Sequence, residues 1–215
     1  MFKKIDCEEK AYWLGFLYAD GYVSSNRNTI ELCLAEKDYG HLVKFKKFIG
    51  KENGINKKQV KQYTAYRYGF RDSIIKKDLF YLGCIPNKSL ILKFPNYEQV
   101  PKNLMHHFMR GYFDGDGYFT NTEKTLSLGF IGTEDFLNGA IEEFDLKRNK
   151  LYEIHEGGNN LRYIMGGKKD IENFLNLMYK DATIYLDRKY DNYLFFARGN
   201  RNITEESEKK TGSLE

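Results

Sequence analysis

The ten residues Trp13-Leu-Gly-Phe-Leu-Tyr-Ala-Asp-Gly-Tyr22 recur as Met109-Arg-Gly-Tyr-Phe-Asp-Gly-Asp-Gly-Tyr118, an offset of 96 residues from 13 to 109. A glycine and then Asp-Gly-Tyr occupy the same places in both copies, and Ala19 is matched by another small residue, Gly115. An alternating apolar run and then a helical apolar pattern follow each copy. The sequence therefore predicts two related halves.

Each half shows the pattern of a helix, two strands, a helix, two strands and a helix. We expect an α+β fold in which two pseudosymmetric αββαββα repeats form a saddle-shaped antiparallel sheet over a central two-helix interface. The first half is expected to span residues 1–97 and the second 98–198, with a disordered tail at 199–215. Asp6 is the expected N-cap of the first helix, and Pro101 is expected to open the helix that carries the second copy.

Composition excludes several classes of protein but indicates no partner by itself. The 215 residues contain 34 Lys and Arg against 30 Asp and Glu, a net charge of +4, so binding to a polyanion requires the positive groups to gather on one face. No apolar run approaches the ~18 residues of a membrane span, and the N-terminus lacks the apolar core of a signal peptide. The three widely spaced cysteines predict reduced thiols, so we expect a cytoplasmic protein without a membrane partner.

Small residues predict a contact between the two motif helices. Gly15 and Ala19 lie four residues apart, as do Gly111 and Gly115, so each pair shares one helix face. An interior glycine costs a helix about 0.5–1 kcal/mol relative to alanine. Because both helices accept this cost, we expect them to pack backbone to backbone on a pseudo-twofold axis.

Asp20 and Asp116 end the same two helices and are candidate metal ligands. A carboxylate at a helix C-terminus faces the negative end of the helix dipole, and two such acids at one interface repel each other. A divalent cation between them removes both penalties, and Mg²⁺ prefers carboxylate oxygens, waters and a substrate phosphate. We therefore expect the two acids to hold Mg²⁺, or a cation such as Mn²⁺ or Ca²⁺, against phosphates of two DNA strands.

The segments Gly15-Phe-Leu-Tyr-Ala-Asp-Gly21 and Gly111-Tyr-Phe-Asp-Gly-Asp-Gly117 resemble the two signature motifs of single-chain LAGLIDADG homing endonucleases. The resemblance extends over roughly residues 8–196. It implies an Mg²⁺-dependent endonuclease that leaves short 3′ overhangs. The first copy departs from the pattern at Tyr18, where the second copy has Asp114.

The resemblance also implies the roles of individual residues. It places Asp20 and Asp116 in catalysis, and it puts Ala19 and Gly115 beside them at the metal site. The segments 85–94 and 182–190 resemble the parts of the family that follow the last helix of each half, where basic residues polarise the attacking water and stabilise the charged transition state. By position, these residues are Lys88 and Lys189, with Arg188 as the competitor of Lys189.

Strand alternation predicts which residues face DNA. The apolar residues of 29–34 and 125–130 should pack on the helices, and the polar residues between them should line the groove. Arginine can read guanine edges and asparagine can read adenine, whereas lysine suits phosphates. The residues expected to contact DNA are Ser24, Asn26, Arg27, Asn28, Lys61, Arg67, Arg71, Asn121, Lys124 and Arg162.

The function predicted from the sequence is site-specific cleavage of double-stranded DNA at a long pseudopalindromic target by a monomer. One alternative is an RNA-binding intron maturase, and another is a catalytically inactive DNA-binding regulator on the same scaffold. Retention of both acids argues against inactivity, because binding alone does not need two repelling carboxylates. Neither end of the chain shows splicing residues, so we expect a free-standing or intron-encoded enzyme of a bacterium or phage rather than a whole intein.

Overall fold

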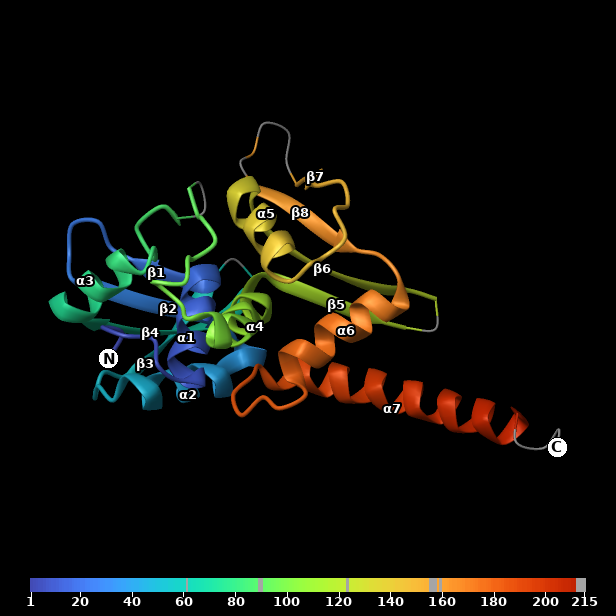
Figure 1. Ribbon diagram of the computed structural model, residues 1–215. Helices are drawn as coiled ribbons and strands as arrows, with labels where there is room; N and C mark the ends of the chain where they lie inside the picture. The colour runs from blue at the N-terminus through green and yellow to red at the C-terminus, as the bar shows by residue number, and fades with distance from the viewer. Residues whose placement is uncertain (61, 89–90, 123, 155–157, 159, 212–215) are drawn as a thin grey trace.

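The computed structural model describes the chain except for residues 61, 89–90, 123, 155–157, 159 and 212–215 and the side chains of 200–211 (Figure 1). The first half has the predicted order of elements. These are α1 (Glu8–Asp20), β1 (Gly21–Val23), β2 (Thr29–Ala35), a 3₁₀ turn η1 (Glu36–Asp38), α2 (Tyr39–Ile49), β3 (Ile55–Val60), β4 (Tyr63–Arg71) and α3 (Ser73–Tyr81).

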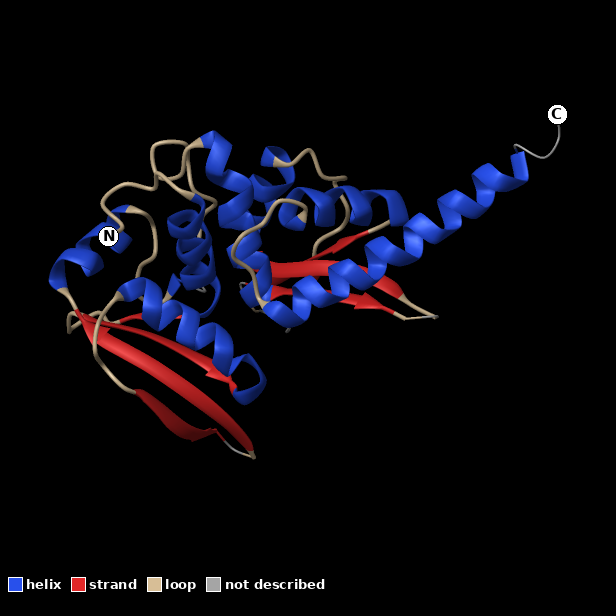
Figure 2. Cartoon of the chain, turned by 90° about the horizontal axis from the view of Figure 1, so that it is seen from below, coloured by secondary structure: helices blue, strands red, loops and turns tan. Residues whose placement is uncertain are grey.

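The second half repeats this order after a 3₁₀ turn, η3 (Lys102–Leu104), and ends with an additional helix, α7. Its elements are α4 (Met105–Asp116), β5 (Gly117–Asn121), β6 (Leu126–Thr133), α5 (Glu134–Glu143), β7 (Tyr152–Glu153), β8 (Asn160–Met165), α6 (Lys168–Tyr179) and α7 (Asp187–Thr211). The sheets have equivalent strand orders, β1-β2-β4-β3 and β5-β6-β8-β7, and Figure 2 shows them as separate layers. The predicted α+β repeat is confirmed, with one antiparallel sheet in each half. The predicted boundary at residue 97 falls in the connection 82–101.

The register of the strands confirms the predicted division of faces in the first sheet. Ile30, Leu32 and Leu34 of β2 pair with Phe70, Tyr68 and Tyr66 of β4, and these residues face the helices. Thr29, Glu31 and Cys33 pair with Arg71, Gly69 and Arg67 on the opposite face. The polar residues of β2 and β4 therefore share the uncovered face of the sheet.

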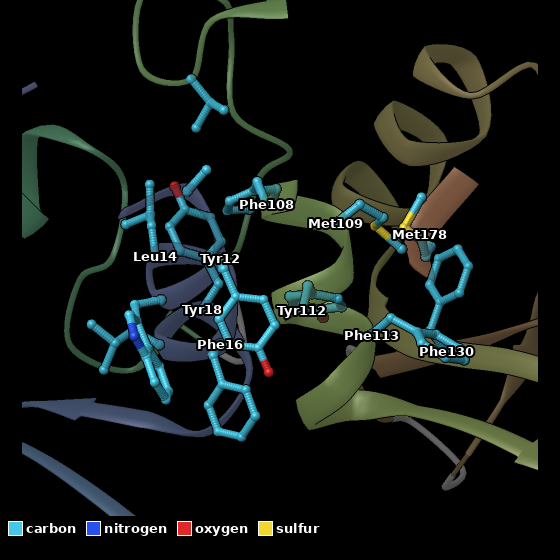
Figure 3. Close-up of a cluster of buried hydrophobic side chains, with 14 of the residues drawn as sticks. Tyr12, Leu14, Phe16, Tyr18, Phe108, Met109, Tyr112, Phe113, Phe130 and Met178 are labelled. Carbon is cyan, nitrogen blue, oxygen red and sulfur yellow. The ribbon is translucent and has the colours of Figure 1, made fainter. Parts of the chain in front are cut away.

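Helices α1 and α4 pack at the centre of the molecule in direct backbone contact. A Cβ placed on Gly111 would lie 1.9 Å from the Tyr12 carbonyl oxygen, and one on Gly15 would lie 1.9 Å from that of Phe108. Aromatic side chains surround this crossing, including Phe16 of α1 and Tyr112 of α4 (Figure 3). Glycine is required at both positions because any side chain would meet backbone rather than a movable neighbour.

The start of α1 differs from the prediction. Cys7, not Asp6, is the N-cap residue, and it makes no side-chain capping bond. The carboxylate of Asp6 instead accepts a hydrogen bond from Lys10 Nζ at 2.7 Å. Pro101 does precede the helical turn that leads into α4, as expected.

The tail expected to be disordered spans 199–215; the structure describes α7 as continuing to Thr211, and residues 212–215 lie outside the described residues. Figure 1 shows this helix extending well beyond the second sheet. In residues 199–211, glutamates at 205 and 206 stand four residues before lysines at 209 and 210, a spacing that favours helix. None of the described helices is long and apolar enough to cross a membrane.

Candidate active site

Asp20 and Asp116 meet at the C-terminal ends of α1 and α4. The position of a Cβ on Gly115 lies 3.2 Å from Asp20 Oδ2 and 2.4 Å from the Ala19 Cβ, so the two helices converge at the acids. Each acid is followed by a glycine that opens a strand, Gly21 of β1 and Gly117 of β5. The backbone contact farther up the helices therefore brings the two carboxylates together.

Both acids have raised pKa values. The pKa of Asp116 rises to about 7, mainly because of burial and next because of the negative charge on Asp20, while Lys88 and Lys189 oppose the rise. Protein packed around the carboxylate also raises the pKa of Asp20, although the residue as a whole is exposed. Within the part of the chain that the structure describes, neither carboxylate has a hydrogen-bond or ion-pair partner.

Two buried lysines flank the acids in pseudosymmetric positions. Lys88 Nζ donates to the carbonyl of Gly21, and Lys189 Nζ donates to the carbonyls of Phe113 and Gly117. The two lysines are 8% and 4% exposed. Burial lowers the pKa of Lys189 to about 8, against the effect of Asp114, Asp20 and Asp116. Each ammonium therefore bonds the carbonyl of the glycine that directly follows the acid of its own half.

Arg188, the competitor of Lys189, is engaged elsewhere. Its Nε donates to Asp38 Oδ1 at 2.8 Å, and its Nη2 donates to Asp38 Oδ2 at 3.2 Å. Asp38 belongs to the first half and Arg188 to the second, and the side chain of Asp38 is 10% exposed. The geometry therefore favours Lys189 over Arg188 as the basic residue that the second half places near the acids. It also reveals the Asp38–Arg188 ion pair, for which the sequence offered no signal.

Asp114 is a second buried acid of the second motif, and unlike Asp116 its carboxylate is fully engaged in hydrogen bonds. Its carboxylate accepts hydrogen bonds from Tyr12 Oη (2.7 Å), Tyr179 Oη (2.5 Å) and the Leu186 backbone N–H (2.7 Å). Tyr18 occupies the matching position of the first motif, and its hydroxyl donates to the carbonyl of Leu82. Tyr18 thus anchors the segment that leads to Lys88, and Asp114 anchors the segment that leads to Lys189. Because a tyrosine hydroxyl serves this purpose in the first half, an acid is dispensable at position 18.

The donor set fits a divalent cation such as Mg²⁺. Among the described residues, no group of three or more Asp, Glu, His or Cys side chains could hold a metal ion, so a cation here would have two carboxylate ligands. Mg²⁺ is usually held in this way, with one or two carboxylates, waters and a substrate phosphate. Ala19 and Gly115 have no side-chain donors, so only their backbone carbonyls could contribute. The unpaired, mutually repelling acids are the observation that supports the fit.

The uncovered face of the first sheet contains a hollow of about 920 Å³. Five residues expected to contact DNA line it: Ser24, Asn26, Arg27, Arg67 and Arg71. Thr29 and Glu31, which alternation placed on the face expected to line the groove, also line it. The remaining lining residues were not singled out, namely Tyr22, Ser25, Lys51, Glu52, Asn53, Asn56, Gly69 and Phe70. Asn28 lies in an adjoining hollow with Arg27 and Arg71.

The loop between β1 and β2 is held by its own atoms and by α3. Ser24 is 7% exposed, and its hydroxyl accepts the backbone N–H of Arg27 at 3.1 Å. Lys76 Nζ donates to the carbonyls of Ser25 (3.2 Å) and Arg27 (2.8 Å). Ser24 lines the hollow and its hydroxyl also shapes the loop that presents Asn26 and Arg27, so its contact with DNA stays a prediction.

The second sheet presents a different face. Arg162 pairs with Ile131 and lies over the ring of Tyr118, 5.9 Å from its centroid. Asn121 pairs with Leu126, which places it on the helix-covered face and contradicts its expected role in DNA contact. Lys124 is exposed in the loop between β5 and β6. The predicted contact Lys61 lies outside the described residues.

No family model matches the chain. In sequence, the chain is 26% identical over 182 residues to the probable translation initiation factor IF-2 of Methanocaldococcus jannaschii. That alignment covers 77% of this chain but 14% of the relative, so the chain matches only a small part of that protein's length.

Solved structures match the chain almost throughout. A double mutant of I-SmaMI has a TM-score of 0.61 at 14% identity and covers 98% of both chains. The LAGLIDADG homing endonuclease I-LtrWI bound to target DNA has a TM-score of 0.60 at 12% identity, over 93% of this chain and 92% of its own. I-SmaMI bound to an uncleaved DNA target with calcium ions has a TM-score of 0.58 at 16% identity, over 92% of both chains. This chain therefore has the fold of the single-chain LAGLIDADG homing endonucleases.

Proposed function

We propose that the chain is a site-specific endonuclease that cleaves both strands of DNA and depends on a divalent cation such as Mg²⁺. The observation that carries this proposal is the pair of unpartnered acids, Asp20 and Asp116, at the meeting point of two helix C-termini. A structural role alone would not place two repelling carboxylates there, because each also faces the negative end of its helix dipole. The structures that share the fold include homing endonucleases bound to DNA.

The bound cation would neutralise charge on the scissile phosphates and lower the pKa of an attacking water. Asp20 and Asp116 would hold it, with the carbonyls of Ala19 and Gly115 as further oxygen ligands. Lys88 and Lys189 would stabilise negative charge that develops on the phosphates. The chain carries one acid and one lysine in each half, so a single monomer can address both strands.

The DNA would lie along the uncovered faces of the two sheets. Arg27, Arg67 and Arg71 in the first half, and Arg162 and Lys124 in the second, would provide guanine and phosphate contacts. The halves present different side chains at matching places, so the target would be pseudopalindromic rather than palindromic.

Plasmid cleavage tests the proposal. The substrate joins the sequences that flank the chain's own gene in its genome, and it is incubated with Mg²⁺ or with a chelator. We expect linear product with Mg²⁺ and none with chelator, and sequencing of the ends should show 3′ overhangs. Asp20→Asn and Asp116→Asn should each abolish cutting, while the matched control Asp145→Asn, an exposed acid after α5, should cut normally.

Cutting that survives both substitutions together would overturn the proposal. A complex with intron RNA and no affinity for the DNA would favour the maturase alternative. Binding to DNA with no cutting in Mg²⁺ or Mn²⁺ would favour the inactive regulator.

A further inference from the structure

The segment that carries Lys189 crosses to the first half, and Figure 1 shows it passing beside α2. We name residues 182–190 the strap. The contacts that fix its early part include the Thr183 N–H to Glu8 (2.8 Å), the Ile184 carbonyl to Arg110 (2.9 Å) and the Leu186 N–H to Asp114 (2.7 Å). Its last part enters α7 and is fixed by the bidentate pair of Arg188 with Asp38.

The carboxylate of Asp38 makes this pair across the two halves and no hydrogen bond within its own helix. Asp38 is the N-cap residue of α2, yet its carboxylate makes no capping hydrogen bond. The corresponding helix α5 is capped in the ordinary way, since the Thr133 hydroxyl accepts the Phe136 N–H at 3.2 Å. Because Asp38 ends the turn η1 that runs directly into α2, at φ −106° and ψ 15°, its carboxylate is not required as a cap and is available to Arg188.

The geometry of α7 links this pair to the active site. Arg188 and Lys189 lie in the first turn of α7, where consecutive side chains point in different directions around the axis. Arg188 points to Asp38, while Lys189 reaches the backbone that leaves Asp116. A side-chain tip lies about 5–6 Å from a helix axis, so a rotation of about 10° would displace it by about 1 Å.

We propose that Asp38 and Arg188 are positioning residues that fix the first turn of α7 so that the Lys189 ammonium stays beside the paired acids. The proposal rests on the proposed function for its kinetic consequence. Lys88 is held by a different segment, which contacts the second half through the bond from the Thr133 hydroxyl to the Leu92 carbonyl. Loss of the Asp38–Arg188 pair should therefore slow the cut of one strand more than the other.

The main test uses Asp38→Ala, Arg188→Ala and the double variant on a supercoiled plasmid that carries the target. A misplacement of about 1 Å can cost about 100-fold in rate. We expect both single variants to accumulate nicked circles, with the nick on one strand, and the second cut to slow by about 10–100-fold. Because the residues act as a pair, the double variant should be no slower than either single one.

DNA binding separates positioning from other roles. Asp38→Ala removes a negative charge that acts on Asp20, so it should bind the target at least as tightly as the wild type in Ca²⁺. Slower cutting with undiminished binding is the expected combination. If Arg188 contacted the phosphates directly, Arg188→Ala would be much slower than Asp38→Ala and the two effects would add.

A readout without DNA tests the same geometry. Amine labelling followed by mass spectrometry should modify Lys189 faster in Asp38→Ala than in the wild type, with Lys88 unchanged. The matched control is Lys44→Met, which removes the neighbouring, more exposed pair of Lys44 with Asp187 on the same strap. This control should leave the labelling of Lys189 and the ratio of nicked to linear DNA unchanged.

The outcomes distinguish this inference from the proposed function. A wild type that cuts no DNA contradicts the proposed function, and the labelling then tests the strap by itself. A wild type that cuts, with Asp38→Ala cutting both strands equally fast and Lys189 labelled at the wild-type rate, overturns the inference alone.

Discussion

Gly111→Ala tests whether backbone contact between α1 and α4 holds the molecule together. The new Cβ would lie 1.9 Å from the Tyr12 carbonyl oxygen, 2.8 Å from the Tyr12 carbonyl carbon and 2.9 Å from the Phe16 nitrogen. Real Cβ atoms essentially never approach closer than 3.0 Å, so the helices must separate by about 1 Å at this point. No side chain can rotate to relieve the contact, because all three atoms belong to the backbone.

The stability change follows from two opposing effects. Overpacking costs about 1–3 kcal/mol, and a contact with rigid backbone belongs at or above the upper end. Alanine recovers about 0.5–1 kcal/mol of helix propensity. We expect a net loss of about 2–3 kcal/mol, which lowers the Tm of a chain of this size by about 4–12 °C.

The matched control is Gly40→Ala in α2, where a Cβ would meet nothing within 4 Å. It should raise the free energy of unfolding by about 0.5–1 kcal/mol. Thermal unfolding followed by circular dichroism measures both variants under the same conditions. A Tm of Gly111→Ala equal to or above that of the wild type would refute the backbone-contact argument. Plasmid cleavage well below both Tm values should also fall, because separating the helices moves Asp20 away from Asp116.

Three further predictions concern charge. The pKa of Asp116 is about 7 in the folded protein, against 3.8 for an unperturbed aspartate, so between these pH values the folded state binds more protons than the unfolded state. The stability that Asp116 contributes is therefore present below about pH 4 and lost as the pH rises through about 7. The Tm of the metal-free wild type, minus that of Asp116→Asn, should therefore fall over this range, and a difference that is constant with pH would contradict the assignment. The guanidinium of Arg110 is 1% exposed and is bonded to Glu8 and to the carbonyls of Met178 and Ile184. Arg110→Met leaves these groups without their partner, so calorimetry should show that the free energy of unfolding falls by about 3–5 kcal/mol. Arg67→Ala should remove about 1–3 kcal/mol of discrimination for guanine in a cleavage selection, whereas Lys124→Ala should weaken binding to all sequences without changing the preferred bases.

Local patterns in the sequence were sufficient for the architecture. Glycines and alanine at four-residue spacing predicted the α1–α4 contact, because only small residues allow two helix backbones to approach. Alternation predicted the faces of β2 and β4, because successive strand residues point to opposite sides. The repeat then placed Asp20 and Asp116 together, since both end the helices that meet on the pseudo-twofold axis.

The tertiary structure decided the surroundings of those acids. Asn121 lies in a polar stretch, yet strand register places it on the helix-covered face. Ser24 lines the hollow, but its hydroxyl also accepts a hydrogen bond within its own loop, which the sequence does not reveal. The choice between Arg188 and Lys189 depended on Asp38, which is 150 positions away in the chain. An ion pair of this separation leaves no periodic signal, because it exists only after both halves have packed.

The sequence alone therefore determined the two-half fold and its central pair of acids, since these depend on helix and strand periods that each half repeats. Only the tertiary structure decided which basic side chain lies at the backbone beside the acids and what holds it there. The reason is that α7 meets α2 across the boundary between the halves, so the orientation of its first turn is set by contacts that neither half contains by itself.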